Sequence, residues 1–382
     1  MKIRGVVVVF ELASDVHIDK GVIEIPLAIA KYYNVKPYLI TRPNPCQDRL
    51  RSKLNVIYVD NNIPENDQAI LTDRTENLKF TKDWFIRATS KAADFGNFLF
   101  IYSFPENTFK STFKFKLNNF IKYRRKSVVV VKFDKSTKVV NQKKVNVKNK
   151  LKFIQKFFWT DFITLENKET FDYYLKFYGF NKYKIKLLPN CPPKSLELIN
   201  NRRNDKRENV IIHVGRIGTF IKATEVLLQA WIDASPQITG WRLKLAGSYT
   251  IEFYNTWNSL LKNKGIADSV IWMGFIKDKE VLFDEYLRSK IFIHTSREES
   301  GPIALFEAVR AGCGVIATNV GAAPFFLEDT ELGMCNVDDI EGIRKAIVTM
   351  ANDDILIERQ VKSMIPKIDI LNWDNQVANI FN

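Results

Sequence analysis

Runs of consecutive apolar residues recur along the first half of the chain, and they predict the buried strands of a parallel sheet. Residues 2–10 (KIRGVVVVF), 98–103 (FLFIYS) and 128–133 (VVVVKF) are the clearest runs. Strands that are covered on both faces have this continuous apolar character. Residues 21–33 carry apolar positions at helical spacing, and we expect this helix to begin near Pro26, because proline is tolerated in a first turn. Further strands of this half are expected at 37–41, 54–59, 161–165 and 184–188.

A second series of the same kind begins after a polar, proline-rich break. The prolines at 189–193 and the charged stretch at 200–209 predict the linker between two domains. Alternating strands and helices predict two Rossmann-like, doubly wound α/β domains that face a central cleft. We place these domains at 1–195 and 196–365, and we expect a terminal helix at 366–382 that can pack back on the first domain. In the second domain, strands are expected at 209–214, 242–246, 270–273, 291–294 and 315–318, with helices at 223–232, 252–262, 279–287 and 302–311.

The length of the chain predicts two domains, and the placement of its cysteines is typical of a protein of the cytoplasm. A chain of 382 residues with 46% apolar residues can bury two cores of ordinary size. The four cysteines are scattered without a CxxC pair, so neither a disulfide framework nor a zinc site is expected. The first apolar run is interrupted by Glu11, and no stretch is long enough to span a bilayer. We therefore expect a cytoplasmic protein whose contact with a membrane is peripheral.

The basic excess of the chain lies entirely in its first half. The net charge is +14, and residues 1–200 hold 36 Lys and Arg against 19 Asp and Glu. Residues 110–156 hold sixteen basic residues and one acidic residue, with apolar residues at helical spacing among them. One interpretation is two helices that dock their apolar stripes on the sheet and leave the lysines in water. The other is contact with an anionic membrane surface, on the inner face of the cell membrane, which the lack of acidic residues favours.

Two glutamates flank a predicted helix start within residues 296–321 (SREESGPIALFEAVRAGCGVIATNVG). Pro302 suits the first position of this helix, and Gly312 or Gly314 suits its end. The free N–H groups of the first turn would bind an anion beside Glu299.

Glu307 has apolar neighbours on both sides, and a buried carboxylate needs a partner. One interpretation gives Glu299 and Glu307 a role in chemistry. The other is structural, with Glu307 tied to a backbone group or to Arg310 and Glu299 an ordinary loop charge.

Two basic residues stand at the end of the first strand of the second half. Arg216 leaves this strand and Lys222 precedes the next helix, so that both cations can converge on one point. A pyrophosphate would satisfy both, because arginine supplies a fork of donors and lysine a point charge. The alternative is a pair of solvated surface cations.

Four features of the second half occur in the order found in retaining GT-B glycosyltransferases, and the chain resembles glycosyltransferase family 4. The resemblance implies a GT-B fold and transfer of a hexose from a nucleotide-diphosphate sugar, with UDP preferred. It is weaker in the first half, at 132–134, 161–166 and 188–190. The four features are Gly215-Arg216 with Lys222, Leu245-Ala246-Gly247, the stretch 270–274 (VIWMG), and the pair Glu299 and Glu307 followed by Gly321.

The resemblance also implies roles for individual residues. Arg216 and Lys222 would hold the donor diphosphate and balance the charge of the leaving group. Glu299 would contact hydroxyls of the transferred sugar, which makes these three the catalytic candidates, and Glu307 would accept hydrogen bonds from the ribose. The other donor-binding candidates are Gly215 next to Arg216, Gly274 and Phe275 on the side of the base, and Gly301, Pro302 and Ile303 at the sugar or phosphate.

Candidates for the acceptor side come from the first half: His17, Lys20, Tyr102 and Ser103. No DxD signature is present, so we expect no metal and no cofactor, with the two cations of the second half in the place of Mg²⁺. The basic segment 110–156 favours a lipid-linked or anionic cell-surface glycan as the acceptor.

Three other functions stay open at this point. They are a glycosyltransferase-like subunit that binds an acidic partner without turnover, a GT-B sugar-nucleotide epimerase, and a nucleic-acid-binding protein. A subunit without turnover has no reason to keep all four of Arg216, Lys222, Glu299 and Glu307. No compact DNA- or RNA-binding motif is found, so no nucleic-acid partner is expected.

Overall fold

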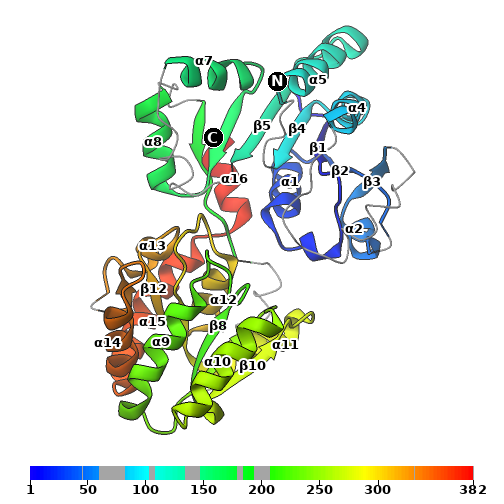
Figure 1. Cartoon of the computed structure of the whole chain (residues 1–382). Coiled ribbons are helices and arrows are strands. Elements are labelled where there is room, and N and C mark those ends of the chain that lie inside the picture. The colour runs from blue at the N-terminus through cyan, green and yellow to red at the C-terminus, as the bar shows by residue number, and fades with distance from the viewer. Residues whose placement is uncertain are drawn as a thin grey trace. The chain divides into compact units, whose positions relative to one another are not determined.

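The chain folds into two compact units in the computed structural model, which describes residues 1–44, 46–59, 82–102, 108–133, 147–178, 184–192, 207–330 and 332–381 (Figure 1). Unit 1 comprises Met1–Pro189 with Trp373–Asn382, and unit 2 comprises Asn190–Asn372. The division therefore falls at Pro189, a few residues before the predicted boundary at 195. Ser103 and the segment 134–146 lie outside the described residues.

Unit 1 is built on a parallel sheet in the order β3-β2-β1-β4-β5-β6-β7. The central strand β1 (Gly5–Val9) pairs with β2 and β4, so that Val7 lies between Tyr38 and Leu99. Its four valines are buried, as the apolar run predicts for a strand covered on both faces. The other strands are β2 (Lys36–Thr41), β3 (Asn55–Tyr58), β4 (Phe98–Tyr102), β5 (Val128–Phe133), β6 (Phe162–Leu165) and β7 (Ile185–Leu187).

The helices of unit 1 lie on both faces of this sheet (Figure 1). They are α1 (Gly21–Tyr32), α2 (Asp48–Lys53), α4 (Lys82–Ala92), α5 (Thr108–Tyr123), α7 (Val147–Lys156), α8 (Lys168–Tyr178) and α16 (Trp373–Phe381).

Helix α1 does not begin near Pro26 as predicted; it begins at Gly21 and contains Pro26. The helix buries nine of its twelve residues. Tertiary packing of this kind outweighs the single hydrogen bond that a proline removes.

The predicted terminal helix at 366–382 is wrong in its bounds, because two helices share that stretch. Helix α15 (Asp354–Asp369) belongs to unit 2, and α16 belongs to unit 1. Lys31 of α1 forms a salt bridge with Asp374 of α16 at 2.5 Å. The ring of Phe381 packs against that of Phe98 at a centroid distance of 5.6 Å.

Unit 2 is built on a second parallel sheet, in the order β10-β9-β8-β11-β12-β13. The predicted class of two doubly wound parallel sheets is therefore confirmed. The strands are β8 (Glu208–Val214), β9 (Arg242–Ala246), β10 (Val270–Gly274), β11 (Ser289–His294), β12 (Gly314–Thr318) and β13 (Met334–Cys335). The helices besides α15 are α9 (Thr224–Ala234), α10 (Ile251–Asn263), α11 (Lys279–Arg288), α12 (Ile303–Ala311), α13 (Ala323–Leu327) and α14 (Ile340–Ala351).

Candidate active site

The carboxyl ends of three neighbouring strands of unit 2 are tied to one another by backbone hydrogen bonds. Gly215 N–H, after β8, donates to Ala246 O of β9 at 3.0 Å. Gly247 N–H, after β9, donates to Gly274 O of β10 at 2.8 Å. A Cβ atom on Gly247 would lie 1.6 Å from Gly215 O, so only glycine allows these strand ends to approach. The loops that follow the strands therefore start from one rigid edge.

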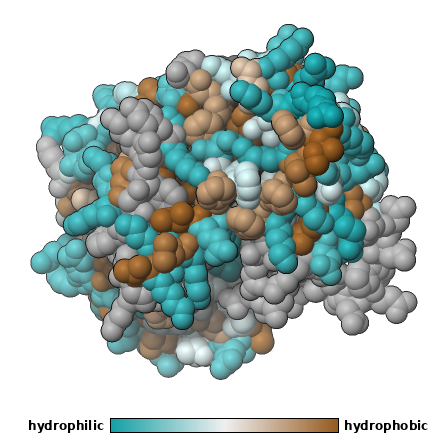
Figure 2. All heavy atoms as spheres, turned by 90° about the horizontal axis from the view of Figure 1, so that it is seen from above, coloured by the Kyte–Doolittle hydropathy of each residue, from teal (hydrophilic) through white to brown (hydrophobic). Residues whose placement is uncertain are grey.

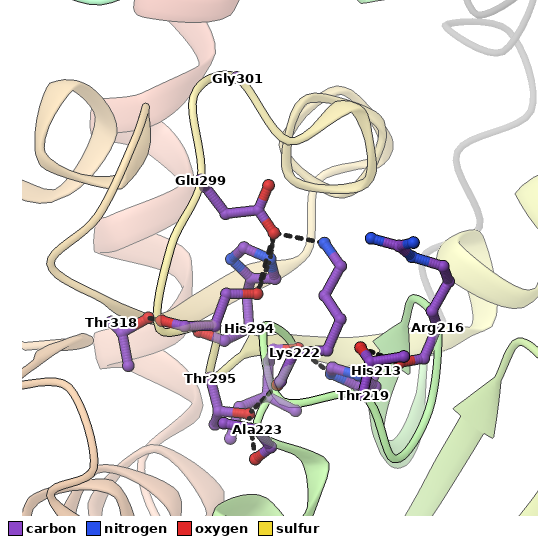
Figure 3. A network of polar contacts seen from close by, with 12 residues as sticks. His213, Arg216, Thr219, Lys222, Ala223, His294, Thr295, Glu299, Gly301 and Thr318 are labelled. Atoms are coloured by element: carbon purple, nitrogen blue, oxygen red, sulfur yellow. Dashed lines mark hydrogen bonds and ion pairs between the residues drawn. The ribbon is translucent and has the colours of Figure 1, made fainter. Parts of the chain in front are cut away.

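The loop between β8 and α9 turns Arg216 and Lys222 to the same side (Figure 3). The hydroxyl of Thr219 donates to Arg216 O at 2.9 Å, and the N–H of Lys222 donates to Thr219 O at 3.0 Å. Thr295, after β11, donates to the carbonyl oxygens of Lys222 and Ala223, both at 3.2 Å. Two strands thus fix the backbone that carries the lysine.

Ala223 holds the left-handed conformation that this loop needs to enter α9, with φ of 47°. The conformation favours glycine, and an alanine here is held by its packing and by the hydrogen bond from Thr295. Arg216 is exposed, and its guanidinium has no carboxylate partner among the residues that the structure describes. Both cations of the predicted pair are therefore presented at one edge of the sheet.

Glu299 is held by three side chains (Figure 3). The ammonium of Lys222 forms a salt bridge with its carboxylate. Nε2 of His294 lies 3.2 Å from the same oxygen, and the hydroxyl of Ser296 donates to it at 2.9 Å. Because an ionised carboxylate only accepts hydrogen bonds, His294 carries its proton on Nε2. Glu299 is therefore not an ordinary loop charge.

The charge of this carboxylate is stabilised against burial. Burial alone would raise the pKa of Glu299, but contacts with His294 and Lys222 outweigh it and lower the pKa to about 2. Burial also lowers the pKa of His294, so the imidazole is neutral near pH 7 and the lysine is the cation that balances Glu299.

A second buried histidine lies beneath the loop of the two cations. Nδ1 of His213, in β8, donates to Ile293 O of β11 at 3.1 Å. Burial, together with the positive charge that His294 would carry, lowers the pKa of His213 to about 3. Both histidines are therefore neutral under the site, and they add no charge that would compete with Lys222.

Glu307 lies on α12 and is buried with partners that the sequence did not indicate. Nζ of Lys279 lies 2.8 Å from its carboxylate, and the hydroxyl of Tyr286 donates to it at 3.1 Å. The alternative partner Arg310 instead forms a salt bridge with Asp369. Burial raises the pKa of Tyr286 well above its ordinary value, and the charge of Glu307 adds to this. The tyrosine therefore stays protonated as a donor.

The start of α12 is one residue later than predicted. Pro302 is the residue before the helix, and Ile303 is its first residue, because the backbone of Pro302 is extended. The predicted end at Gly312 is confirmed by its left-handed conformation. The amide of Asn190 donates to Gly301 O at 3.0 Å, which fixes the turn before the helix. At the edge of the sheet, Gly274 ends strand β10, and the next residue, Phe275, has 55% of its surface exposed.

Residues 208–353 match the family described as Glycosyl transferases group 1. This part of the chain, which carries the candidate site, is similar to that family.

Curated relatives resemble the chain over part of its length and part of their own. A stretch of 139 residues is 25% identical to the lipopolysaccharide core biosynthesis mannosyltransferase LpcC of Rhizobium leguminosarum bv. viciae, covering 35% of this chain and 39% of LpcC. A stretch of 150 residues is 26% identical to N-acetyl-alpha-D-glucosaminyl L-malate synthase of Bacillus anthracis, covering 39% of this chain and 38% of that enzyme. The chain thus matches less than half the length of either relative.

Solved structures resemble the whole chain in fold. HepE from Anabaena, solved in complex with UDP and glucose, has a TM-score of 0.66 at 14% identity and covers 98% of both chains. A glycosyltransferase from Rickettsia africae ESF-5 has a TM-score of 0.69 at 15% identity and covers 98% of this chain and 96% of its own. The GT-B fold predicted from the sequence is confirmed.

The predicted acceptor-side residues lie in unit 1, outside the group 1 region. His17 and Lys20 follow β1, and Tyr102 ends the adjacent strand β4, so all three lie at the carboxyl edge of the unit 1 sheet. His17 packs edge-on against Phe10 at 4.9 Å, and its Nδ1 accepts a hydrogen bond from Ser14 N–H at 3.1 Å. His17 thus has a structural role in its own loop.

Several residues that build the candidate site were not predicted. His294 and Ser296 hold Glu299, Lys279 pairs with Glu307, and Asn190 fixes Gly301. His294, Ser296 and Glu299 stand close together in sequence at the end of an apolar strand. This cluster of polar residues is the pattern in the sequence from which their contact could have been predicted. Lys279 and Asn190 are too distant in sequence from their partners to be paired without coordinates.

The described ranges lack two features, a cluster of metal-binding side chains and a helix that could span a bilayer. There, no group of three His, Cys, Asp or Glu side chains is arranged to hold a metal ion. No helix of these ranges combines the length and apolar character needed to cross a bilayer.

Proposed function

We propose that this chain is a retaining glycosyltransferase that moves a hexose from a nucleotide-diphosphate sugar to a lipid-linked or anionic cell-surface glycan. One observation supports this most strongly: Arg216 and Lys222 are presented together at the carboxyl edge of a parallel sheet, beside a carboxylate that is fixed by three contacts. Ligands of open α/β sheets bind at this edge.

In the proposed mechanism, the two cations stabilise the departing diphosphate. The bond between the sugar and the diphosphate breaks, and negative charge develops on the phosphate oxygen. Arg216 and Lys222 stabilise that charge, and the phosphate oxygen takes the proton of the acceptor hydroxyl while the oxygen of that hydroxyl bonds to the anomeric carbon on the same face of the sugar. Glu299, kept ionised by its low pKa, accepts hydrogen bonds from hydroxyls of the transferred sugar. No second carboxylate is required as a base.

The donor and acceptor classes are supported by the relatives. HepE was solved with UDP and glucose, which favours a UDP-sugar. LpcC is named for lipopolysaccharide core biosynthesis, which favours a cell-envelope glycan as acceptor. Glu307, buried next to Lys279 and Tyr286, is the candidate for the ribose hydroxyls.

Lys222→Ala tests the proposal. We expect release of UDP from UDP-glucose, or from the sugar donor that a thermal-shift screen selects, to fall about 100- to 1000-fold, because a preorganised charge at the leaving group is lost. Lys262→Ala, at an exposed position of α10, is the matched control and should keep wild-type activity. Wild-type nucleotide release by the Lys222 variant would refute the assignment.

The same assay separates the alternative functions. A wild-type protein that binds the donor and releases no nucleotide under any acceptor condition would be a binding subunit. Release of nucleotide with free sugar, unaffected by added glycolipid acceptor, would indicate the epimerase class.

A further inference from the structure

Helix α5 presents four large apolar residues to solvent, while its buried face is polar apart from Phe115. Phe120 and Ile121 are 63% and 58% exposed. The helix packs on α4, where the amide of Asn118 donates to the hydroxyl of Ser90 at 2.8 Å. The residues on its buried face are Thr108, Ser111, Thr112, Phe115 and Asn119, and those on its exposed apolar face are Phe113, Leu117, Phe120 and Ile121.

Helix α7 repeats this arrangement. It contains no buried residue, and its inner side contacts the sheet through Phe153, whose ring lies 6.1 Å from that of Phe133. Its large apolar residues recur at helical spacing on the outer side and are exposed: Val147, Leu151, Ile154 and, just after the helix, Phe158. The interpretation in which both apolar stripes dock on the sheet is therefore wrong.

The two exposed stripes are joined by one aromatic side chain. The ring of Trp159 lies 5.1 Å from that of Phe113 in α5 and 5.0 Å from that of Phe158. We call the eight exposed apolar residues of the two stripes the α5–α7 face. In the view from above, onto the end of unit 1 where Figure 1 shows these helices, apolar patches lie among hydrophilic side chains (Figure 2).

Lysines lie beside this apolar surface. Lys110 and Lys114 of α5 and Lys148 and Lys152 of α7 are exposed. Within the part of the chain that the structure describes, these four form no salt bridge. Neither helix contains an acidic residue. The apolar face is thus accompanied by unneutralised positive charge.

We propose that the α5–α7 face docks on an anionic lipid surface, with its apolar side chains in the headgroup boundary and its lysines on lipid phosphates. Exposed apolar rows beside lysines are typical of helices that lie in a membrane interface. A second copy of the chain fits less well, because it would bring lysines against lysines. Nucleic acid fits less well too, because five of the eight apolar residues are aliphatic and offer no ring on which bases stack.

Vesicle sedimentation tests this proposal without reference to catalysis. We expect the wild type to sediment with phosphatidylcholine vesicles containing 30% phosphatidylglycerol, to remain in solution with pure phosphatidylcholine, and to be released by 0.5 M NaCl. Phe120→Gln with Leu151→Gln should lower the partition coefficient about tenfold or more. The matched control is Ile251→Gln with Ile355→Gln, two equally exposed apolar positions of unit 2, which should bind as the wild type.

Charge is tested separately with Lys114→Gln, Lys148→Gln and Lys152→Gln. Each should lower binding to the anionic vesicles about fivefold, because a basic residue at such a surface contributes attraction of that size. Lys262→Gln and Lys264→Gln in unit 2 are the controls. Thermal stabilisation by UDP should be unchanged in every variant, so that failure of docking and failure of the proposed donor site are distinguished.

Four outcomes would overturn the proposal. Three concern vesicles: equal, salt-insensitive binding to both kinds of vesicle, no binding to either, or wild-type binding by the Phe120 and Leu151 variant. The fourth is a dimer in sedimentation equilibrium that this variant converts to monomer, which would assign the face to a second copy of the chain.

Discussion

At the scale of single residues, the position of Glu299 depends on side chains that need not touch the substrate. Ser296 and neutral His294 donate to the oxygen that also meets Lys222. Hydrogen bonds to an ionised group contribute about 1.5–3 kcal/mol each. Ser296 and His294 are therefore positioning residues for the carboxylate.

Ser296→Ala should weaken binding of the sugar nucleotide more than binding of UDP alone. The hydroxyl orients Glu299, which in the proposed function meets the sugar and not the nucleotide. We expect about tenfold weaker affinity for the sugar nucleotide and unchanged affinity for UDP, measured by titration calorimetry. Ser363→Ala, on α15, is the control. Equal weakening for both ligands would show a general disturbance of the site.

The residues that bear charge were easier to predict than their partners. Arg216 and Lys222 could be placed together because each stands at a strand end or helix start of a parallel sheet. Glu307 could be recognised as buried from its apolar neighbours, but not as the partner of Lys279, which lies 28 positions earlier in the chain. A periodic pattern shows which face a residue occupies and not which distant side chain meets it.

At the scale of elements, the close approach of the ends of β8 and β9 is the strictest backbone requirement of the site. A side chain on Gly247 would collide with Gly215 O, whereas one on Gly240, also in a positive-φ conformation, would meet nothing within 4 Å. Variants at these two glycines therefore distinguish the cost of a steric collision from the cost of backbone strain alone.

Gly247→Ala should lower the free energy of unfolding by about 3 kcal/mol or more, because a backbone contact must open. Gly240→Ala should cost about 1 kcal/mol, because only backbone strain is introduced. Thermal unfolding of both variants measures the difference. Similar losses for the two would mean that the strand ends can separate at little cost.

Strands of this chain could be predicted from sequence, and helix orientation could not. The run of valines in β1 is buried on either face, so its assignment needs no knowledge of its neighbours. In α5, by contrast, four large apolar residues occupy the outer face, while Thr112 and Asn119 are buried beside Phe115. Spacing alone assigns the apolar stripe of a helix to the core. This assignment is wrong for a helix whose apolar stripe is exposed to solvent.

At the scale of the whole molecule, the two buried histidines make unit 2 sensitive to acid. His213 and His294 are neutral when folded, because burial lowers their pKa. An unfolded histidine binds a proton below about pH 6.5, so the unfolded state gains protons as the pH falls. The stability of unit 2 should therefore decrease as the pH falls below about 6.5. Glu299 should add to this loss between about pH 4.5 and pH 2, because its carboxylate has a pKa of 4.5 in the unfolded chain and about 2 in the folded one.

His213→Asn should remove part of this dependence, because the asparagine amide can still donate to Ile293 O and does not titrate. Hydrogen exchange of peptides from β8 and β11 at pH 7, 6 and 5 gives the local stability after correction for intrinsic exchange rates. The wild type should lose up to about 1.4 kcal/mol per pH unit more than the variant. Parallel pH profiles would show that His213 does not contribute.

The placement of α16 in unit 1 has a consequence for synthesis of the chain. Phe381 covers Phe98, yet the whole of Asn190–Asn372 is translated between the first part of unit 1 and this helix. At 5–20 residues per second, the ribosome needs on the order of 10 to 40 s for that interval. Throughout it, the nascent chain carries an uncovered patch on α1 and β4 that only the late-emerging helix can close, and this is the period in which a chaperone would have most to protect.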